Sequence, residues 1–340
     1  MYSVSKQAIK NSTIFSLLLT VVIFSFMVSC SEDKPGEAIF RNLLEGKEVS
    51  DIVLYQGYIY ASGMEGVYRI NPDTLEVETL DFGNIFLAKD MVVDGEILYI
   101  GHDGGIVMFD GEKYSSILDE ASNVPDFRVN GLMIDESETI WAGTYGGVLK
   151  LVDGVWQSIT VKDGLLFDTV FLIMEDGYGG IIFGHYGSSK EGISYLKNGQ
   201  WSYFTVETGL PHNYITDGLR IGDFIYVTTG FYEVGGIAVF ETSPVGIKLV
   251  DTIVEQWGEY GSKARSINND NEYFWIGTEY NGLCIMKGDI FVRIDTDDGL
   301  VNNEVKSILF DNNGRVWLAT RKGVSVTSKQ ELYDLFNSRK

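Results

Sequence analysis

Ring-bearing and cationic side chains that differ between otherwise similar stretches are the residues of this sequence that could do chemistry. The candidates are His102, Tyr145, Tyr186, Tyr232, Tyr280, Arg128 and Arg321. Flat apolar sugar faces stack on rings, while hydroxyl and peptide groups bond the polar side chains. The set therefore predicts noncatalytic binding of a glycan, a peptide or a protein partner. Tyrosines that only cover the ends of structural units would explain the same residues equally well.

Acid–base or metal chemistry would have to use the three histidines. They are His102, His185 and His212, and none has the spacing of a zinc site. The sequence also lacks an EF-hand loop and a nucleophile elbow. We therefore expect no metal, no cofactor and no catalytic residue. The alternative is an enzyme such as a lyase, which requires a histidine and a carboxylate close together in one cleft.

The two cysteines occur in different contexts. Cys284 lies in an apolar run and is expected to be a buried, inert thiol. Cys30 ends an uncharged run that begins at Ile14 and follows Lys6 and Lys10, which is typical of a secretory signal. A membrane helix that is not cleaved is the alternative interpretation of this run.

The residues Met27, Val28, Ser29 and Cys30 resemble the lipobox of bacterial lipoproteins. This resemblance implies a signal peptide at 1–29, acylation of Cys30 and a tether at 30–37. It also implies anchoring to the outer membrane, on its periplasmic or surface side. The acidic residues Glu32 and Asp33 resemble the surface-export signals of Bacteroidetes lipoproteins.

Acidic residues exceed basic residues, with 48 Asp and Glu against 26 Lys and Arg and a formal net charge of −22. Nucleic acid is therefore an unsuitable partner. The charge is spread along the chain and indicates solubility outside the cytoplasm. We expect a monomer that reaches a membrane only through its lipid.

An internal repeat determines where the candidate side chains lie. Seven copies align on Tyr60, Tyr99, Trp141, Ile182, Tyr226, Trp275 and Trp317. The spacing ranges from 39 residues (Tyr60 to Tyr99) to 49 residues (Tyr226 to Trp275). A small residue follows each of these positions two residues later, as Gly143 follows Trp141. Seven copies at this period predict an all-β, seven-bladed propeller over residues 38–327.

The chain ends complete the predicted propeller. Residues 38–44 resemble the outer fourth strands and precede the first copy, so they are expected to pair with the last copy and close the ring. Ser328 and Glu331 form a capping-box pattern, and Leu332, Leu335 and Phe336 share one helical face. A short helix over residues 328–340 should cover the closing blade.

Residues that recur at the same position of several copies are assigned to the scaffold. Trp141, Trp275 and Trp317 are expected to wedge between blades. Aspartates at the first hairpin turn are expected to bond their own backbone; these are Asp94, Asp135, Asp176, Asp270 and Asp311. The varying candidates fall in loops that join strands two to three and four to one. In a propeller these loops share one face, the default binding site.

Two segments carry a family resemblance. Residues 311–326 (DNNGRVWLATRKGVSV) and 136–151 (ESETIWAGTYGGVLKL) resemble two-component regulator propeller repeats. Such repeats form the periplasmic sensor regions of hybrid histidine kinases in Bacteroidetes, and the resemblance covers residues 38–327. It implies a propeller that senses a ligand. The given sequence has no kinase core, so we do not expect phosphotransfer.

Overall fold

The computed structural model describes residues 39–83, 85–122, 124–187, 191–254 and 261–340. The predicted signal peptide, the acylated Cys30 and the tether lie outside these residues. Within the described ranges, no helix has both the length and the apolar character needed to cross a membrane.

Within the described residues, twenty-eight strands form seven sheets of four strands each. Blade 1 consists of β2 (Val49–Tyr55), β3 (Tyr58–Gly63), β4 (Gly66–Ile70) and β5 (Val77–Leu80). Blade 2 consists of β6 (Asp90–Asp94), β7 (Ile97–His102), β8 (Gly105–Phe109) and β9 (Tyr114–Leu118). Blade 3 consists of β10 (Val129–Ile134), β11 (Ile140–Thr144), β12 (Gly147–Val152) and β13 (Val155–Ile159).

Blade 4 consists of β14 (Val170–Glu175), β15 (Ile181–His185), β16 (Ile193–Lys197) and β17 (Gln200–Phe204). Blade 5 consists of β18 (Ile215–Ile221), β19 (Phe224–Phe231), β20 (Val234–Ser243) and β21 (Gly246–Ile253). Blade 6 consists of β22 (Ala264–Asn269), β23 (Phe274–Thr278), β24 (Leu283–Lys287) and β25 (Ile290–Ile294). Blade 7 consists of β26 (Val305–Phe310), β27 (Arg315–Thr320), β28 (Gly323–Ser328) and β1 (Arg41–Leu43).

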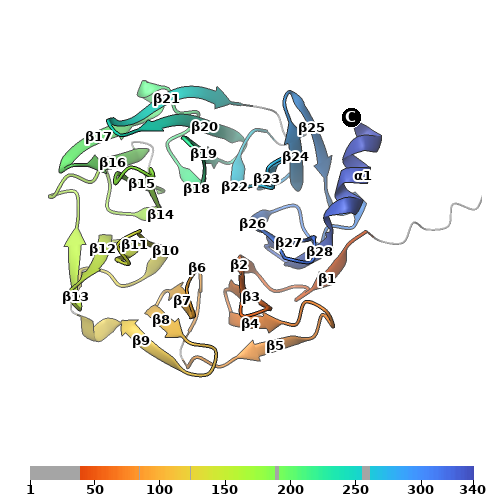
Figure 1. The fold of residues 1–340 in the computed structure, drawn as a ribbon, viewed down its shortest axis with the longest axis horizontal. Coiled ribbons are helices and arrows are strands. Elements are labelled where there is room, and N and C mark those ends of the chain that lie inside the picture. The colour runs from red at the N-terminus through yellow and green to blue at the C-terminus, as the bar shows by residue number, and fades with distance from the viewer. Residues whose placement is uncertain (1–38, 84, 123, 188–190, 255–260) are drawn as a thin grey trace, which may run out of the picture. The chain divides into compact units, whose positions relative to one another are not determined.

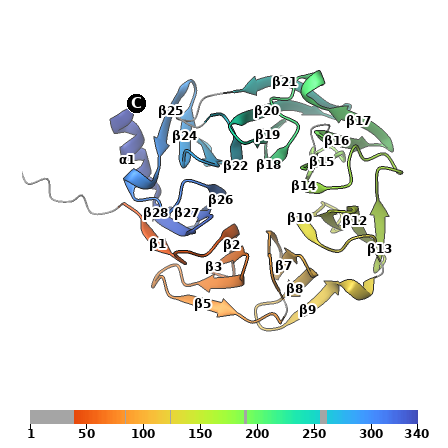
Figure 2. The ribbon, with the colours of Figure 1, turned by 180° about the vertical axis from the view of Figure 1, so that it is seen from behind.

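The seven sheets stand around a common centre, with the first strand of each repeat innermost (Figures 1 and 2). This confirms the predicted seven-bladed propeller. β1 pairs antiparallel with β28, joining Arg41 to Val326 and Leu43 to Val324. The N-terminal strand therefore closes the ring as predicted, and the last blade has no missing strand.

Apolar side chains between neighbouring sheets form the core. Trp141 packs with residues of blades 3 and 4, Trp275 with blades 6 and 7, and Trp317 with blades 7 and 1. Each indole N–H also donates to the turn aspartate of its own blade, over 2.8 Å for Trp141 to Asp135. For Trp275 to Asp270 and Trp317 to Asp311 the distance is 2.9 Å. The predicted wedges are confirmed.

The turn aspartates bond their own backbone, with one exception. Asp135, Asp176, Asp270 and Asp311 each accept two backbone N–H groups of the first hairpin through Oδ1. The prediction was wrong for Asp94. That residue pairs with Ile97 in the ladder, and the tight turn between them places Gly95 at a φ of +53°. A turn this short leaves no loop of N–H groups for the carboxylate to cap.

Helix α1 (Lys329–Arg339) follows β28 directly. Ser328 and Glu331 form the predicted capping box. Leu332 and Phe336 are buried in the apolar cluster shared by blades 6 and 7, and Leu335 packs beside them. Tyr333 donates to Asp270 of blade 6 over 2.5 Å. The helix therefore covers the seam between blades 6 and 7 and not the closing blade alone.

Candidate functional site

The small residue in the second strand of a repeat lets the next blade approach closely. A Cβ at Gly143 would lie 2.7 Å from the carbonyl oxygen of Val170, and one at Gly277 would lie 2.5 Å from that of Val305. Both distances are shorter than real Cβ contacts. The first residue of an inner strand thus packs closely against the preceding blade. This contact fixes the position at which the inner strand begins to line the channel.

A β-bulge interrupts six of the seven inner strands immediately after this point. The ladder register shifts at the start of β2, β10, β14, β18, β22 and β26. Such a bulge leaves one residue unpaired and re-aims its side chain. The unpaired residues, with Lys89 in the equivalent place of blade 2, form what we name the bulge ring: Ser50, Lys89, Asn130, Phe171, Thr216, Arg265 and Lys306.

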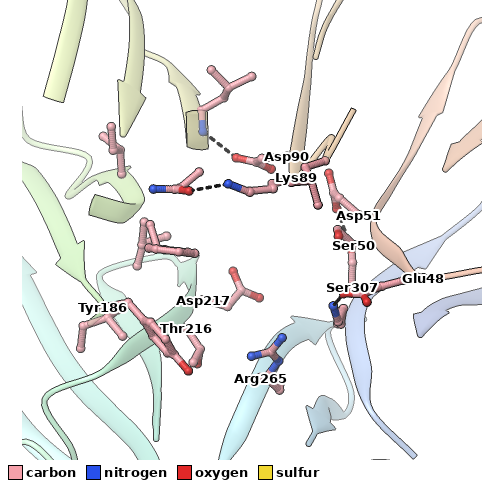
Figure 3. A pocket seen from close by; sticks show the side chains of 18 of the residues that line it. Glu48, Ser50, Asp51, Lys89, Asp90, Tyr186, Thr216, Asp217, Arg265 and Ser307 are labelled. Carbon is pink, nitrogen blue, oxygen red and sulfur yellow. Dashed lines mark hydrogen bonds and ion pairs between the residues drawn. The ribbon is translucent and has the colours of Figure 1, made fainter. Parts of the chain in front are cut away.

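All seven residues of the bulge ring line a cavity of about 360 Å³ at one mouth of the central channel. Met64 of the β3–β4 loop and Leu87 of the β5–β6 loop also line it, together with Tyr186 of the β15–β16 loop. Loops joining strands two to three and four to one therefore meet at this mouth, as the sequence predicted. Figure 3 shows Tyr186, Thr216, Arg265 and Lys89 arranged around the opening.

Three carboxyl groups lie one residue deeper in the channel. Asp51 accepts the N–H of Met91 at 2.9 Å and Asp90 accepts that of Leu132 at 2.6 Å. Asp217 accepts the N–H of Ile267, also at 2.9 Å. Each carboxyl group thereby ties one inner strand to the next.

Burial raises the pKa of each of these carboxyl groups, to about 7 for Asp217. For Asp90 the nearby charge of Asp51 adds to the effect of burial. Protein surrounds these groups, while their side chains keep partial contact with the water of the channel. The channel lining therefore favours the uncharged form of its own acids.

Aromatic side chains form a continuous series on the mouth side of blades 3 to 5. Successive ring centroids are 4.2 to 6.1 Å apart along Tyr145, Phe171, Tyr186, Tyr214, Phe231 and Tyr232. Tilted and edge-to-face pairs at such distances stabilise one another. We name this series the aromatic wall. It offers ring surface to a molecule that enters the mouth.

Ion pairs occupy the other side of the mouth, on blades 6, 7 and 1. Glu304 contacts Arg265 at 3.0 Å, Arg321 at 3.5 Å and Lys306 at 3.8 Å. Glu279 contacts Arg265 at 3.5 Å and also pairs with Lys263. Lys306 pairs in addition with Glu48. We name these seven residues the rim cluster.

The predicted ligand residues lie in different settings. Tyr145, Tyr186 and Tyr232 belong to the aromatic wall, and Lys89 and Arg128 each lie 4.7 Å from the Tyr145 ring centroid. Arg321 joins the rim cluster, and Tyr280 is part-exposed in the β23–β24 loop. His102 is buried and accepts the N–H of Gly104. Ligand contact by these residues remains a prediction.

The sequence analysis missed Phe171, Tyr214, Arg265 and Lys306. Phe171, Arg265 and Lys306 directly follow a fully buried aliphatic residue that starts an inner strand, as Phe171 follows Val170. That position in each repeat was the available signal. It was overlooked because regular strand alternation does not show which residue a bulge turns toward the channel.

The histidines are held inside the protein by ordinary hydrogen bonds. His185 contacts Ser194 Oγ at 2.8 Å and the Thr169 carbonyl at 3.2 Å, and burial lowers the pKa of both His185 and His102 to about 4. His212 Nδ1 accepts the Tyr214 N–H. Across the described ranges, no hydrogen bond or ion pair joins a histidine to a carboxylate.

Cys284 is a free, buried cysteine. Burial raises the pKa of Cys284 to about 12, which fits the predicted inert thiol. In the part of the chain that the structure describes, no group of three or more His, Cys, Asp or Glu side chains could hold a metal ion.

Comparison with known proteins supports the resemblance found in the sequence. Residues 299–322 match the model of the two component regulator propeller family. No curated protein matches the chain.

Solved structures share the fold at low sequence identity. The extracellular domain of the hybrid two component system BT3049 from B. thetaiotaomicron is similar with a TM-score of 0.67 and 17% identity, covering 85% of this chain and 42% of that one. The extracellular domain of the one component system BT4673 from B. thetaiotaomicron is similar with a TM-score of 0.66 and 20% identity, covering 85% of this chain and 39% of that one. PorZ, a surface component of the type-IX secretion system of Porphyromonas gingivalis, is similar with a TM-score of 0.62 and 14% identity, covering 83% of this chain and 46% of that one.

The chain thus spans less than half the length of each of these proteins. The TM-scores show a common fold, and sequence identities this low show nothing finer. This protein is a seven-bladed β-propeller in which residues 299–322 match the two component regulator propeller family.

Proposed function

We propose that this protein is a noncatalytic binding or sensing protein of the cell envelope, which holds a glycan or a peptide in the mouth of its central channel. The observation that carries the proposal is the composition of that mouth. Phe171 and Tyr186 of the aromatic wall and Glu48, Arg265 and Lys306 of the rim cluster line one cavity of about 360 Å³. The volume lies in the lower range of ligand sites, and the lining combines ring surface with many polar and charged groups.

The remaining parts of the proposal rest on the sequence and on similar structures. The signal run and Cys30 support export and a lipid anchor at the outer membrane. Two of the similar structures are extracellular domains of bacterial two component or one component systems. Extracellular sensing is the shared property that we transfer to this chain, and we expect it to act as a monomer.

The decisive experiment removes ring surface from the mouth. The triple variant Tyr145→Ala, Tyr186→Ala, Tyr280→Ala should bind cell-envelope glycans or peptides at least about tenfold more weakly, because each ring in contact with a ligand contributes on the order of 1 kcal/mol. Glycan arrays and pull-downs from envelope extracts would measure this loss. The melting temperature of the variant should show that the fold is retained.

Tyr178→Ala is the matched control. Tyr178 is about as exposed as Tyr145 and Tyr280, but it lies in the β14–β15 turn, at the end of the blade opposite to the mouth. If Tyr178→Ala weakens binding as strongly as the triple variant does, the mouth is not the binding site.

A further inference from the structure

The rim cluster carries one more positive than negative charge. Its cations are Lys263, Arg265, Lys306 and Arg321, and its acids are Glu48, Glu279 and Glu304, all linked by the ion pairs described above. The side chains of Lys263, Lys306 and Glu304 are only 2%, 12% and 11% exposed. Charges this far from water are normally paired. The acids of the cluster therefore leave one positive charge that is not neutralised.

The excess charge is directed into the channel. Arg265 and Lys306 occupy equivalent bulge positions in neighbouring blades, and both line the cavity. Their nitrogens lie 3.0 and 3.8 Å from the same oxygen of Glu304, which shows that the two cations are close enough for one carboxylate to contact both. The guanidinium has five N–H donors, which exceeds the two ion pairs that Arg265 makes with Glu304 and Glu279.

Two other cations at the mouth have acids of their own. Lys89 pairs with Asp103 at 2.5 Å, and Arg128 pairs with Asp126 at 2.6 Å, so each of these cations has its own acid. Asp51, Asp90 and Asp217 lie one residue deeper, and each carboxyl group accepts at least one backbone N–H group. An anion held at the level of the bulge ring would not have to displace them.

A flat surface faces the cations across the channel. Phe171 belongs to the bulge ring, and its ring centroid lies 5.2 Å from that of Tyr186, which also lines the cavity. The mouth thus combines a two-point cationic contact with an opposing ring surface. A carboxylate attached to a compact ring would use both sides at once.

We propose that the channel mouth recognises a carboxylate group, held between Arg265 and Lys306, on a ligand whose flat face packs against Phe171 and Tyr186. This inference rests on the proposed function, since it specifies the ligand of the same mouth. The carboxylate can come from an acidic sugar or from the C-terminus of a peptide. Both sources present the same two oxygens to the cations.

Matched probes separate the charge from the rest of the ligand. Galacturonate is compared with galactose, and the dipeptide Gly-Tyr with its amide, in calorimetric titrations of the full-length protein. The acid of at least one pair should bind at least tenfold more tightly than its uncharged partner. The pair that shows this preference identifies the source of the carboxylate.

Variants then locate the preference. Arg265→Met should abolish the difference in affinity between the acid and its uncharged partner. Arg265→Lys should retain part of this difference, because an ammonium group keeps the positive charge but lacks the planar pair of donors of the guanidinium. If Arg265→Met does not fold, Lys306→Met serves in its place. Arg69→Met removes a cation from an ion pair with Glu78 on the outer part of blade 1 and should leave the preference unchanged.

Three results would overturn the proposal: equal binding of acids and uncharged partners, no binding of either acid, or a preference that survives both Arg265→Met and Lys306→Met. If the uncharged probes bind as well as the acids and Tyr186→Ala abolishes both, the carboxylate is excluded while the mouth stands as the binding site. Loss of the mouth itself would instead appear in the triple tyrosine experiment.

Discussion

The carboxyl group of Asp217 should make the stability of the propeller depend on pH, and Asp217→Asn should remove this dependence. Burial raises the pKa of Asp217 to about 7 in the folded protein, while an exposed aspartate titrates near 3.8. The folded state therefore binds the proton more tightly than the unfolded chain. Its stabilising effect is complete below the unfolded pKa and is lost as the pH rises through the folded pKa of about 7.

The size of the effect follows from the shift. At about 1.4 kcal/mol per pKa unit, a rise from 3.8 to about 7 corresponds to roughly 4 kcal/mol in total, and the part between pH 8 and pH 5 is smaller. The side chain keeps some contact with channel water, which screens its charge. We therefore expect the free energy of unfolding of the wild type to rise by about 1–2 kcal/mol more than that of Asp217→Asn between pH 8 and pH 5.

The amide also changes the hydrogen bonds at this site. Asp217 accepts the N–H of Ile267 at 2.9 Å and that of Gly218 at 2.7 Å, and asparagine has one acceptor oxygen where aspartate has two. Losing one such bond costs about 1 kcal/mol at every pH. The informative quantity is therefore the pH dependence of the difference between the two proteins.

Urea unfolding followed by tryptophan fluorescence at pH 5, 6, 7 and 8 would measure this difference for the wild type and the variant. Asp223→Asn, an exposed aspartate in the β18–β19 turn of the same blade, is the control and should run parallel to the wild type. Asp51 and Asp90 are present in all three proteins, and because the charge of Asp217 raises the pKa of Asp90, the difference between wild type and variant includes this coupling. A wild type minus Asp217→Asn difference that stays constant from pH 5 to pH 8 would refute the reasoning.

Three further predictions concern other parts of the chain. Asp176→Ala should lower the free energy of unfolding by about 3–5 kcal/mol in urea, because it leaves the buried ammonium of Lys197 without its carboxylate; a loss below about 1 kcal/mol would argue against a tight pair. Trp317→Phe should cost about 1–3 kcal/mol and lower the melting temperature, since the smaller ring leaves a void between blades 7 and 1 and removes the bond to Asp311; an unchanged melting temperature would contradict this packing. Cys30→Ser should abolish labelling with a fatty-acid analogue and move the protein from the detergent phase to the aqueous phase, whereas equal labelling of both forms would refute the anchor.

The repeat made most of the scaffold predictable from sequence. Trp141, Gly143 and Asp135 recur at fixed offsets, and each offset has one structural consequence: a wedge between blades, a close approach of the next strand, or a capped turn. Because these effects are local or act between adjacent copies, the period alone predicts seven blades. The Asp94 turn escaped prediction since the length of the connection, and not the residue type, decided its geometry.

The binding mouth was predictable only in part. Tyr145, Tyr186 and Tyr232 were identified because their loops share a face, and the structure joins them into one aromatic wall. His102 was expected there for the same reason, but its ring turns inward to the Gly104 N–H. Loop position alone does not determine the direction of a side chain.

The sequence by itself determined the number of blades, the closure of the ring by residues 38–44 and the capped helix at the end of the chain, because each follows from short-range periodicity. The tertiary structure alone decided which side chains meet at the mouth. Arg265 and Lys306 are 41 residues apart in the sequence, and Phe171 lies still farther away, yet ring closure and the bulges bring all three to one cavity. A strand-period pattern does not show a bulge, and the charge balance of the mouth arises only after side chains of separate blades have been brought together.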